Sequence, residues 1–288
     1  MPTTKTLPVV HATDLTSWKK CARQAKYTQV LRLRPRGPQK GLDVGTCGHI
    51  ALQAYYSRQS PYGGVHWSKP HMVFRLAWQE MTQGMVIPED IAKDADVVEA
   101  LLERYPEWAK EYDDFTVVQT EQEFEAPIFR PGTDEVVGVH RGKWDLFVMD
   151  RTGAVWLMDH KFLARWPSEE VLKRDEQMGW YVLGAHRLLP QYNVRGVMYN
   201  VIRKTNPATA RDDYFRRWRI GLSLPELRTL EWNLFGTMKR RLEDDLFLPN
   251  PGPIQCGGCA YKDLCIMENN GQDPAVIGPQ LFDVVEGR

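Results

Sequence analysis

The stretch GKWDLFVMDRTGAVWLMDHKFL, residues 142–163, decides the fold because it predicts a β-hairpin with a defined register. Asp150 suits the first position of a type I turn, and Gly153 can supply the left-handed residue that ends a three-residue loop. If Asp150 pairs with the residue after Gly153, Asp145 lies directly opposite Asp159. Side chains alternate between the faces of a strand, so these two aspartates are expected on one face.

Apolar residues dominate both faces of the predicted hairpin, which indicates a strand pair in the middle layer of a three-layer fold. Lys161 and Lys143, expected opposite each other, share the face of the two aspartates. The rest of that face is Phe147, Met149, Val155 and Leu157, and the other face holds Trp144, Leu146, Val148, Trp156, Met158 and His160.

Two carboxylates that face each other, with Cβ atoms roughly 4.5–5.5 Å apart, repel unless something compensates. A divalent cation is the natural compensator, and hard oxygen ligands suit Mg²⁺ or Mn²⁺. Lys161, two residues after Asp159, can orient or deprotonate a water or hold a phosphate oxygen. The alternative is a pair of surface aspartates salt-bridged to two lysines. The apolar flanks of both strands weigh against that alternative.

The bulk composition supports a sizeable core, since 43% of the 288 residues are hydrophobic. No run of about twenty apolar residues occurs, so no membrane span is expected. The N-terminus MPTTKTLPVV lacks the charged-then-apolar build of a secretion signal, so an intracellular, cytoplasmic location is expected. The net charge of zero argues neither for nor against a nucleic-acid partner.

Two arginine clusters are candidate phosphate-binding patches, although each can equally be an ordinary solvated face. The first consists of Arg32, Arg34 and Arg36. The second consists of Arg211, Arg216, Arg217 and Arg219, with Tyr214, Phe215 and Trp218 nearby.

The order of predicted elements is helices, three strands, a helix, two strands and a helix, which favours one mixed α/β sheet with helices on both faces. The predicted helices are 14–31, 44–57, 70–83, 89–112, 168–189 and 224–246, and the predicted strands are 115–129, the two strands of the hairpin, 194–203 and 213–221. We expect Asp14 or Thr16 to cap the first helix.

Two neighbouring elements bring further polar side chains toward the hairpin. A turn centred near Thr133 puts Glu121 or Glu123 roughly level with Asp145, and the sequence does not decide between them. In the helix 168–189, Gln177 and Tyr181 are spaced i and i+4 and therefore lie on one face.

The segment CGGCAYKDLC, residues 256–265, contains three closely spaced cysteines that look like metal ligands. These are Cys256, Cys259 and Cys265, spaced C-x2-C-x5-C. Five cysteines in all, unevenly placed, argue against a disulfide framework. Cys21 is favoured as the fourth ligand because its amphipathic segment can pack against the C-terminal region, whereas Cys47 is interpreted as a core thiol. Zinc and an iron–sulfur cluster both accept four cysteines, and spacing alone does not choose between them. Either would join the two ends of the chain around the hairpin.

With these motifs in place, the chain resembles the RecB-like branch of the PD-(D/E)XK nucleases, in particular its iron–sulfur members related to AddB and to the CRISPR-associated RecB-like exonucleases. The matching motifs are G-x-x-x-H (Gly45 to His49), E-x-x-F (Glu121 to Phe124), G-K-W-D (Gly142 to Asp145), D-H-K (Asp159 to Lys161) and Q-x-x-x-Y (Gln177 to Tyr181), with the four cysteines around them. They follow the family's order over nearly the whole chain.

The resemblance implies a restriction-endonuclease-like fold, with residues 1–288 as a single RecB-like nuclease domain in which 14–31 and 250–268 form the cysteine cluster region. It implies that Lys161 is the catalytic lysine, acting with Asp145 and Asp159. The implied ligands of Mg²⁺ or Mn²⁺ are His49, Glu121, Asp145 and Asp159. The resemblance also implies a 4Fe-4S cluster, with zinc as the less favoured occupant, and its implied ligands are Cys21, Cys256, Cys259 and Cys265. Gln177 and Tyr181 are implied DNA contacts, and a packing role for them is nearly as well favoured.

The favoured functional hypothesis is metal-dependent hydrolysis of DNA phosphodiester bonds. Exonuclease action on single-stranded ends is the first expectation, in recombination, repair or CRISPR or phage DNA processing. The sequence contains no G-x-x-x-x-G-K-[ST], so we expect no helicase motor in it, and action alone or with a separate helicase or recombination partner. The competing hypothesis is a non-catalytic DNA-binding or scaffold protein with a structural four-cysteine metal site, against which the complete Asp, Asp, Lys and His set argues.

Overall fold

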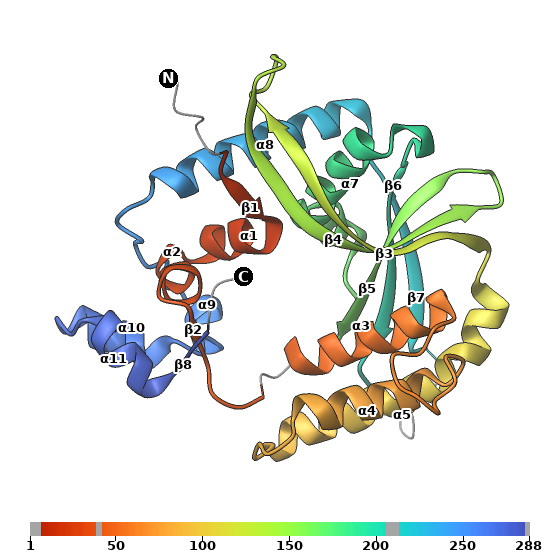
Figure 1. The fold of residues 1–288 in the computed structure, drawn as a ribbon, viewed down its shortest axis with the longest axis horizontal. Helices are drawn as coiled ribbons and strands as arrows, with labels where there is room; N and C mark the ends of the chain where they lie inside the picture. The colour runs from red at the N-terminus through yellow and green to blue at the C-terminus, as the bar shows by residue number, and fades with distance from the viewer. Residues whose placement is uncertain (1–6, 39–41, 206–212, 286–288) are drawn as a thin grey trace. The chain divides into compact units, whose positions relative to one another are not determined.

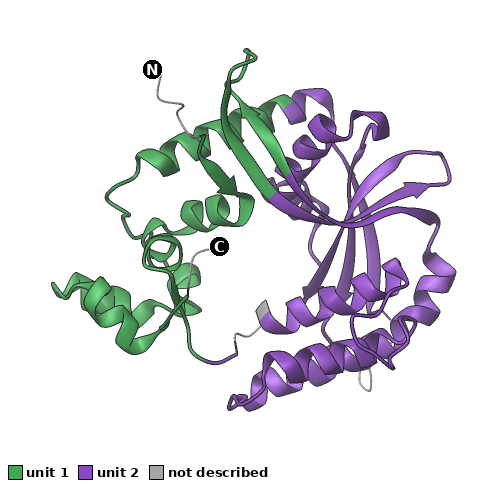
Figure 2. Cartoon of the chain, viewed as in Figure 1, with its two compact units in different colours: residues 1–36, 125–141, 228–288 green, residues 37–124, 142–227 purple. Residues whose placement is uncertain are grey.

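A computed structural model describes residues 7–38, 42–205 and 213–285 of the chain. The chain groups into two compact units (Figure 2). Unit 1 comprises residues 1–36, 125–141 and 228–288, and unit 2 comprises residues 37–124 and 142–227. The single domain expected over 1–288 stays a prediction.

Unit 2 is built on a mixed β-sheet (Figure 1). Its strands are β3 (Phe115–Phe129), β4 (Val136–Asp150), β5 (Val155–Leu163), β6 (Gly196–Arg203) and β7 (Phe215–Gly221), of which β3 and β4 also continue into unit 1. β4 pairs with β3 and, antiparallel, with β5; β5 pairs parallel with β6; and β6 pairs antiparallel with the edge strand β7. The predicted mixed sheet and its strands are confirmed.

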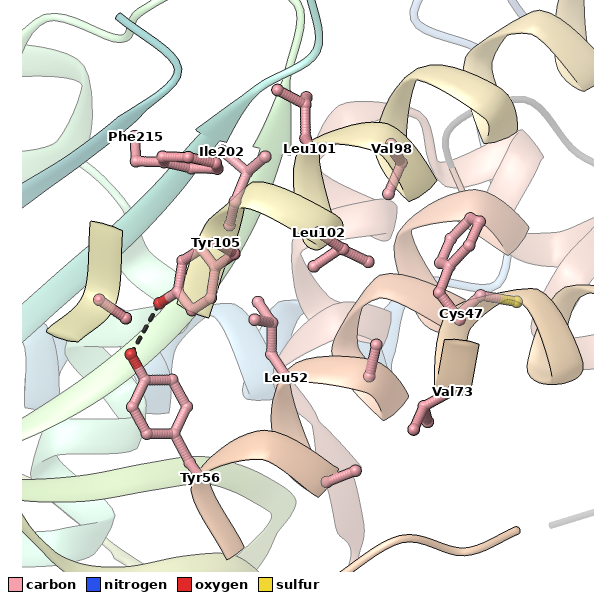
Figure 3. Packing of buried hydrophobic residues seen from close by; sticks show 14 of the residues in the cluster. Cys47, Leu52, Tyr56, Val73, Val98, Leu101, Leu102, Tyr105, Ile202 and Phe215 are labelled. Carbon is pink, nitrogen blue, oxygen red and sulfur yellow. Dashed lines mark hydrogen bonds between the residues drawn. The ribbon is translucent and has the colours of Figure 1, made fainter. Parts of the chain in front are cut away.

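Helices cover both faces of this sheet. On one face, α3 (Leu42–Ser57), α4 (Pro70–Met81) and α5 (Glu89–Tyr112) form the main core, part of which is shown in Figure 3. Leu146, Val148 and Met158 of the hairpin belong to the same core. On the other face lie α6 (Glu169–Lys173) and α7 (Glu176–Leu188), where the Leu172 carbonyl accepts a hydrogen bond from the Tyr199 hydroxyl at 3.2 Å. The predicted sheet flanked by helices is therefore confirmed.

The hairpin loop has the predicted geometry. The Asp150 backbone N–H donates to the Ala154 carbonyl at 2.9 Å, and Gly153 has φ 82°. The Asp150 carboxylate accepts from the Thr152 N–H at 2.9 Å and from the Trp156 indole at 2.9 Å. The predicted register is confirmed from Leu146 paired with Met158 to Met149 paired with Val155. Asp145 and Asp159 come next along the two strands.

Asp150→Ala is expected to destabilise the protein by about 1 kcal/mol, because it removes the acceptor that organises the loop. Hydrogen bonds from Thr152 lower the pKa of Asp150 to about 2, so this contribution is present at neutral pH and is lost as the pH falls from 3.8 toward 2. Urea unfolding at pH 7 measures the change. Asp150→Asn keeps an acceptor oxygen and should lose less, and equal stability of all three proteins would contradict the assignment.

The predicted helix over 14–31 is interrupted at Cys21. The structure has α1 (Ala12–Lys20), α2 (Ala22–Ala25) and a π-helical turn, η1 (Lys26–Val30), with Cys21 between them in an extended conformation at φ −162° and ψ 108°. The predicted cap is also wrong, because His11 precedes the first turn and neither Asp14 nor Thr16 caps it. No glycine or proline marks the break, so the local pattern could not reveal it.

The predicted helix over 168–189 is two helices rather than one. Ser168 caps α6, and Asp175 caps α7 by accepting the Met178 backbone N–H at 3.3 Å. Serine and aspartate both prefer N-cap positions, so the second cap starts a new helix where helical periodicity alone predicts continuity. The break frees the Asp175 side chain to face the hairpin.

Unit 1 combines N-terminal and C-terminal segments around a small apolar core of Tyr27, Leu33, Tyr261, Leu264 and Phe282. Its elements include β1 (Val9–His11), β2 (Leu33–Arg34), most of α8 (Leu224–Glu243), α9 (Pro253–Gly257), α10 (Lys262–Asn269), α11 (Pro274–Leu281) and β8 (Asp283–Val284). A short 3₁₀ turn, η2 (Pro190–Tyr192), belongs to unit 2. Across the described residues, no helix combines the length and apolarity needed to cross a membrane.

Candidate active site

α3 brings His49 to the hairpin. Its Nδ1 lies 3.1 Å from Asp145 Oδ2, and its ring meets the His160 ring edge-on at 5.9 Å. α3 approaches β5 closely because Gly48 lies against Phe162, where a Cβ would stand only 2.3 Å from the Phe162 ring. A side chain at position 48 would therefore force either the Phe162 ring or the helix that carries His49 to shift.

Asp145 has two partners, the His49 ring and the His160 backbone N–H, which donates to Asp145 Oδ2 at 3.2 Å. Burial alone would raise the pKa of Asp145, but the charge and hydrogen bond of His49 outweigh it and lower the pKa to about 2. For His49, burial would lower the pKa, and Asp145 raises it. The two groups therefore stabilise each other in their charged forms.

The strict alternation expected for the hairpin fails beside Asp145. Trp144 was expected on the face of Leu146 and Val148, and this expectation is wrong. The Trp144 ring stacks on Phe124 at 4.1 Å, meets Phe147 at 5.0 Å and donates its indole N–H to a carbonyl of α7 at 3.3 Å. Burial of the large Trp144 ring on the α7 side outweighs the preference of successive strand residues to alternate between faces.

Asp159 and Lys161 form an ion pair on β5. Lys161 Nζ lies 2.9 Å from Asp159 Oδ2 and 3.7 Å from Asp175 Oδ2. Burial raises the pKa of Asp159 to about 6, with Lys161 opposing and the nearby Asp145 carboxylate adding to the rise. Asp145 and Asp159 both act on the pKa of His49 as well. The two aspartates are thus close enough to interact electrostatically. The strand pairing is defined from Leu146 and Met158 to Met149 and Val155, so the placement of Asp145 directly opposite Asp159 stays a prediction.

Lys161 is held as a cation. Burial would lower its pKa, but Asp159 and Asp175 together raise it. A protonated lysine at neutral pH can hold a phosphate oxygen or orient a water, and it cannot take a proton from one. Of the roles considered for Lys161 from the sequence, the geometry favours positioning.

Sequence reasoning missed Asp175. Its carboxylate both caps α7 and stands beside Lys161, so one side chain ties the start of the helix to the hairpin. The sequence does contain an N-cap signal, because an aspartate precedes a run of helix-forming residues, but the single helix predicted over 168–189 places Asp175 in its interior.

Glu121, rather than Glu123, faces the hairpin. Glu121 lines a small cavity of about 10 Å³ together with His49, Asp145 and His160, and pairs with Lys143. Glu123 is exposed and does not line this cavity. A cavity of this volume has room for about one water molecule.

Gln177 and Tyr181 lie on α7 at the same site. Gln177 hydrogen-bonds Tyr181, whose pKa is raised first by burial and further by the charges of Asp159 and Asp145. Gly142 permits this approach, since a Cβ there would lie 2.7 Å from the Phe124 ring and 3.0 Å from the Tyr181 ring. The tyrosine is therefore held beside the two aspartates in its neutral form.

The donor set is compatible with a divalent cation. It combines hard carboxylate oxygens, an imidazole and a water-sized cavity. Burial and, to a lesser extent, the Asp145 charge raise the pKa of Asp159, and a cation would compensate both. In the part of the chain that the structure describes, however, no three His, Cys, Asp or Glu side chains are arranged so as to hold a metal. The carboxylates of Asp145 and Asp159 are instead turned to His49 and Lys161.

Four of the five cysteines gather in unit 1. Burial raises the pKa of Cys259, and the other three cysteines that act on it are Cys21, Cys256 and Cys265. Arg23 Nη1 lies 3.8 Å from Cys265 Sγ. Cys47 is fully buried in the core of unit 2, and burial raises its pKa to about 12, so the interpretation as a core thiol is confirmed.

The arginine clusters are mostly paired. In the second cluster, Arg217 is buried against Asp113, while Arg216 and Arg219 lie nearer the surface; Arg211 lies outside the described residues. In the first, Arg36 pairs with Asp283 at 3.3 Å.

Comparison with known proteins shows which family the chain matches. A model of the PD-(D/E)XK nuclease superfamily matches residues 11–266. Among solved structures, the crystal structure of SSO0001 is similar to this chain, with 12% sequence identity, a TM-score of 0.39 and coverage of 91% of this chain and 88% of that chain. No curated protein matches the chain.

Proposed function

This chain belongs to the PD-(D/E)XK nuclease superfamily, and from that premise we propose that it is a metal-dependent DNA exonuclease that prefers single-stranded ends. Membership of the superfamily implies a phosphodiesterase that acts on DNA. The observation that carries the proposal is the pair of electrostatically coupled aspartates, Asp145 and Asp159, flanked by His49 and the cationic Lys161.

Asp145, Asp159, His49 and Glu121 are the residues that would hold Mg²⁺ or Mn²⁺. A bound divalent cation lowers the pKa of its water and stabilises negative charge on the phosphate. Asp145 is the better prepared ligand, because its pKa of about 2 keeps it ionised throughout the physiological range.

Lys161 would hold a non-bridging phosphate oxygen and align the attacking water. Its charge is maintained by Asp159 and Asp175, so a phosphate entering the site meets a lysine that is already protonated. Gln177 and Tyr181 would contact the DNA backbone from α7, since Tyr181 stands beside both aspartates as a neutral hydrogen-bond donor.

The four cysteines of unit 1 would bind a 4Fe-4S cluster, with zinc as the alternative occupant. Support comes from the closeness of Cys21, Cys256 and Cys265 to Cys259, although they are contributed by opposite ends of the sequence. Recombination, repair or CRISPR or phage DNA processing is the proposed setting, alone or with a separate helicase or recombination partner.

A digestion series tests the proposal. Single-stranded and duplex oligonucleotides labelled at the 5′ or 3′ end are incubated with the protein and Mg²⁺, Mn²⁺ or EDTA. We expect short products from single strands with either metal and none in EDTA, because the carboxylate pair needs a cation. Circular single strands should resist, since they have no end.

Two outcomes would count against parts of this proposal. Rapid cutting of circular strands would show endonuclease action instead. DNA binding without cleavage under any metal would favour the scaffold alternative.

A further inference from the structure

The register of the sheet shows which residues of the edge strand β7 share a face with the candidate active site. Asp159 is paired with Tyr199, and Tyr199 with Trp218; in the same way Lys161 is linked through β6 to Arg216. Paired residues share a face, and strands are about 4.8 Å apart. Trp218 and Arg216 therefore lie on the face of the catalytic pair, about 10 Å away along the sheet.

Trp166, just after β5, extends this face. Its ring centroid lies 5.6 Å from that of Trp218, and the guanidinium groups of Arg216 and Arg203 lie 4.7 Å and 5.0 Å from it. Its indole N–H donates to Asp213 at 3.2 Å. These contacts hold two arginines and two indole rings together beside the catalytic strand.

A groove of about 520 Å³ opens at the β7 edge. Its lining includes Trp108, Tyr112, Arg216, Arg217, Trp218 and Arg219. That volume is in the range of sites that bind small organic molecules. Trp218 and Arg216 line this groove, and their register places them on the same face of the sheet as the catalytic pair.

The α5 side of the groove is a rigid aromatic stack with an exposed outer ring. Tyr112 is 53% exposed and stacks on Trp108 at 5.2 Å with 18° between the rings. Trp108 also receives the Arg217 guanidinium at 4.5 Å. Arg217 is fixed by Asp113 and by the Tyr112 carbonyl, to which it donates at 2.8 Å.

The arginines of the groove are balanced by aspartates, and this balance indicates what kind of ligand the groove binds. Arg216 pairs with Asp213 and Arg219 with Asp114, all four partly exposed. Exposed ion pairs contribute little net stability, so each arginine can exchange its aspartate for a phosphate. The near-neutral charge, however, leaves stacking rather than electrostatic attraction as the main source of affinity.

We propose that this groove binds single-stranded DNA next to the scissile phosphate, with unpaired bases stacking on Trp218 and Tyr112 while Arg216 and Arg219 contact backbone phosphates. The inference rests on the proposed function, since the strand is the one entering the site of Asp159. A separation of about 10 Å corresponds to about three stacked nucleotides at 3.4 Å each. Duplex DNA is disfavoured because its bases already stack on each other.

Binding is tested without cleavage, by fluorescence anisotropy of a labelled oligothymidylate of about 15 nucleotides in EDTA. Trp218→Ala and Tyr112→Ala are each expected to weaken binding about tenfold, because one stacked base is lost. Trp218→Phe and Tyr112→Phe should retain most of the affinity. Arg216→Gln should reduce the slope of log affinity against log salt by about 0.7, the contribution of one phosphate contact.

Trp67→Ala is the matched control, since Trp67 carries an arginine, Arg58, at 5.8 Å but does not line the groove. The exposed Tyr112 can be truncated with little effect on folding, which circular dichroism melting checks. Unchanged affinity in both alanine variants, a loss no larger than that of Trp67→Ala, or an equal loss for duplex DNA would overturn the inference. Because binding is measured in EDTA, it does not depend on cleavage. Failure to cleave with Mg²⁺ or Mn²⁺ in the digestion series would therefore refute the hydrolase proposal and leave the binding result intact.

Discussion

Asp159→Asn is expected to lower the rate of Mn²⁺-dependent DNA cleavage on the order of 10³-fold. The substitution keeps the shape of the side chain and removes the charge that would help to hold the cation and that orients Lys161 at 2.9 Å. Initial rates on end-labelled single strands measure the effect. Cleavage at the wild-type rate would reject the proposed site.

The same variant should be more stable than the wild type when metal is absent. The pKa of Asp159 is raised from 3.8 to about 6, so the folded state binds its proton more tightly than the unfolded state does. The wild type therefore loses stability as the pH rises through that window, and Asp159→Asn does not. At pH 7.5 in EDTA the melting temperature of the variant should be higher by a few degrees. If Asp159→Asn loses cleavage activity but gains stability, the charge of Asp159 serves function rather than folding.

Two lysine variants, one at the site and one away from it, separate an effect on catalysis from an effect on folding. Lys161→Met should lower cleavage on the order of 10²-fold or more, because the phosphate loses its cationic partner. Lys204→Met removes another lysine that is mostly buried, paired with Asp94 elsewhere in unit 2. That variant should lose stability and keep its cleavage rate. Equal rate losses in the two lysine variants would indicate that only folding is affected.

Cys259→Ser is expected to abolish binding of the proposed metal centre and to destabilise unit 1 severely. Binding of a metal centre by four thiolates contributes directly to folding, on the order of 10 kcal/mol for structural zinc sites. The proposed ligands would also close a loop from Cys21 to the C-terminal triplet. Iron, zinc and acid-labile sulfide per chain are measured after anaerobic purification, together with the melting temperature and resistance to proteolysis.

Cys47→Ser is the control for this variant, because it also replaces a cysteine thiol but removes no proposed metal ligand. Cys47 is buried in unit 2, so its variant should lose stability through packing and keep its full metal content. Zinc in place of iron and sulfide would replace the proposed cluster with a zinc site. A wild-type protein without either metal would refute the four-cysteine site altogether.

Local physics explains why much of the fold could be predicted. The Asp150 carboxylate and the left-handed Gly153 determine the loop within five residues, and a two-residue period then sets the pairing of the strands that follow. The long amphipathic helix α5 and strand β3 have the predicted bounds for the same reason, since their patterns repeat over many residues. Motif order identified the family, which the match over residues 11–266 supports independently.

The sequence by itself therefore determined the hairpin and its register, the mixed sheet and the set of candidate residues, because turn chemistry, periodicity and motif spacing act over short distances. Only the tertiary structure decided what those side chains contact. It placed Asp175 beside Lys161, turned Trp144 toward α7, buried Arg217 and left Arg216 and Trp218 at the sheet edge. These outcomes depend on burial and on charges brought together from distant parts of the chain, which no local pattern of residues records.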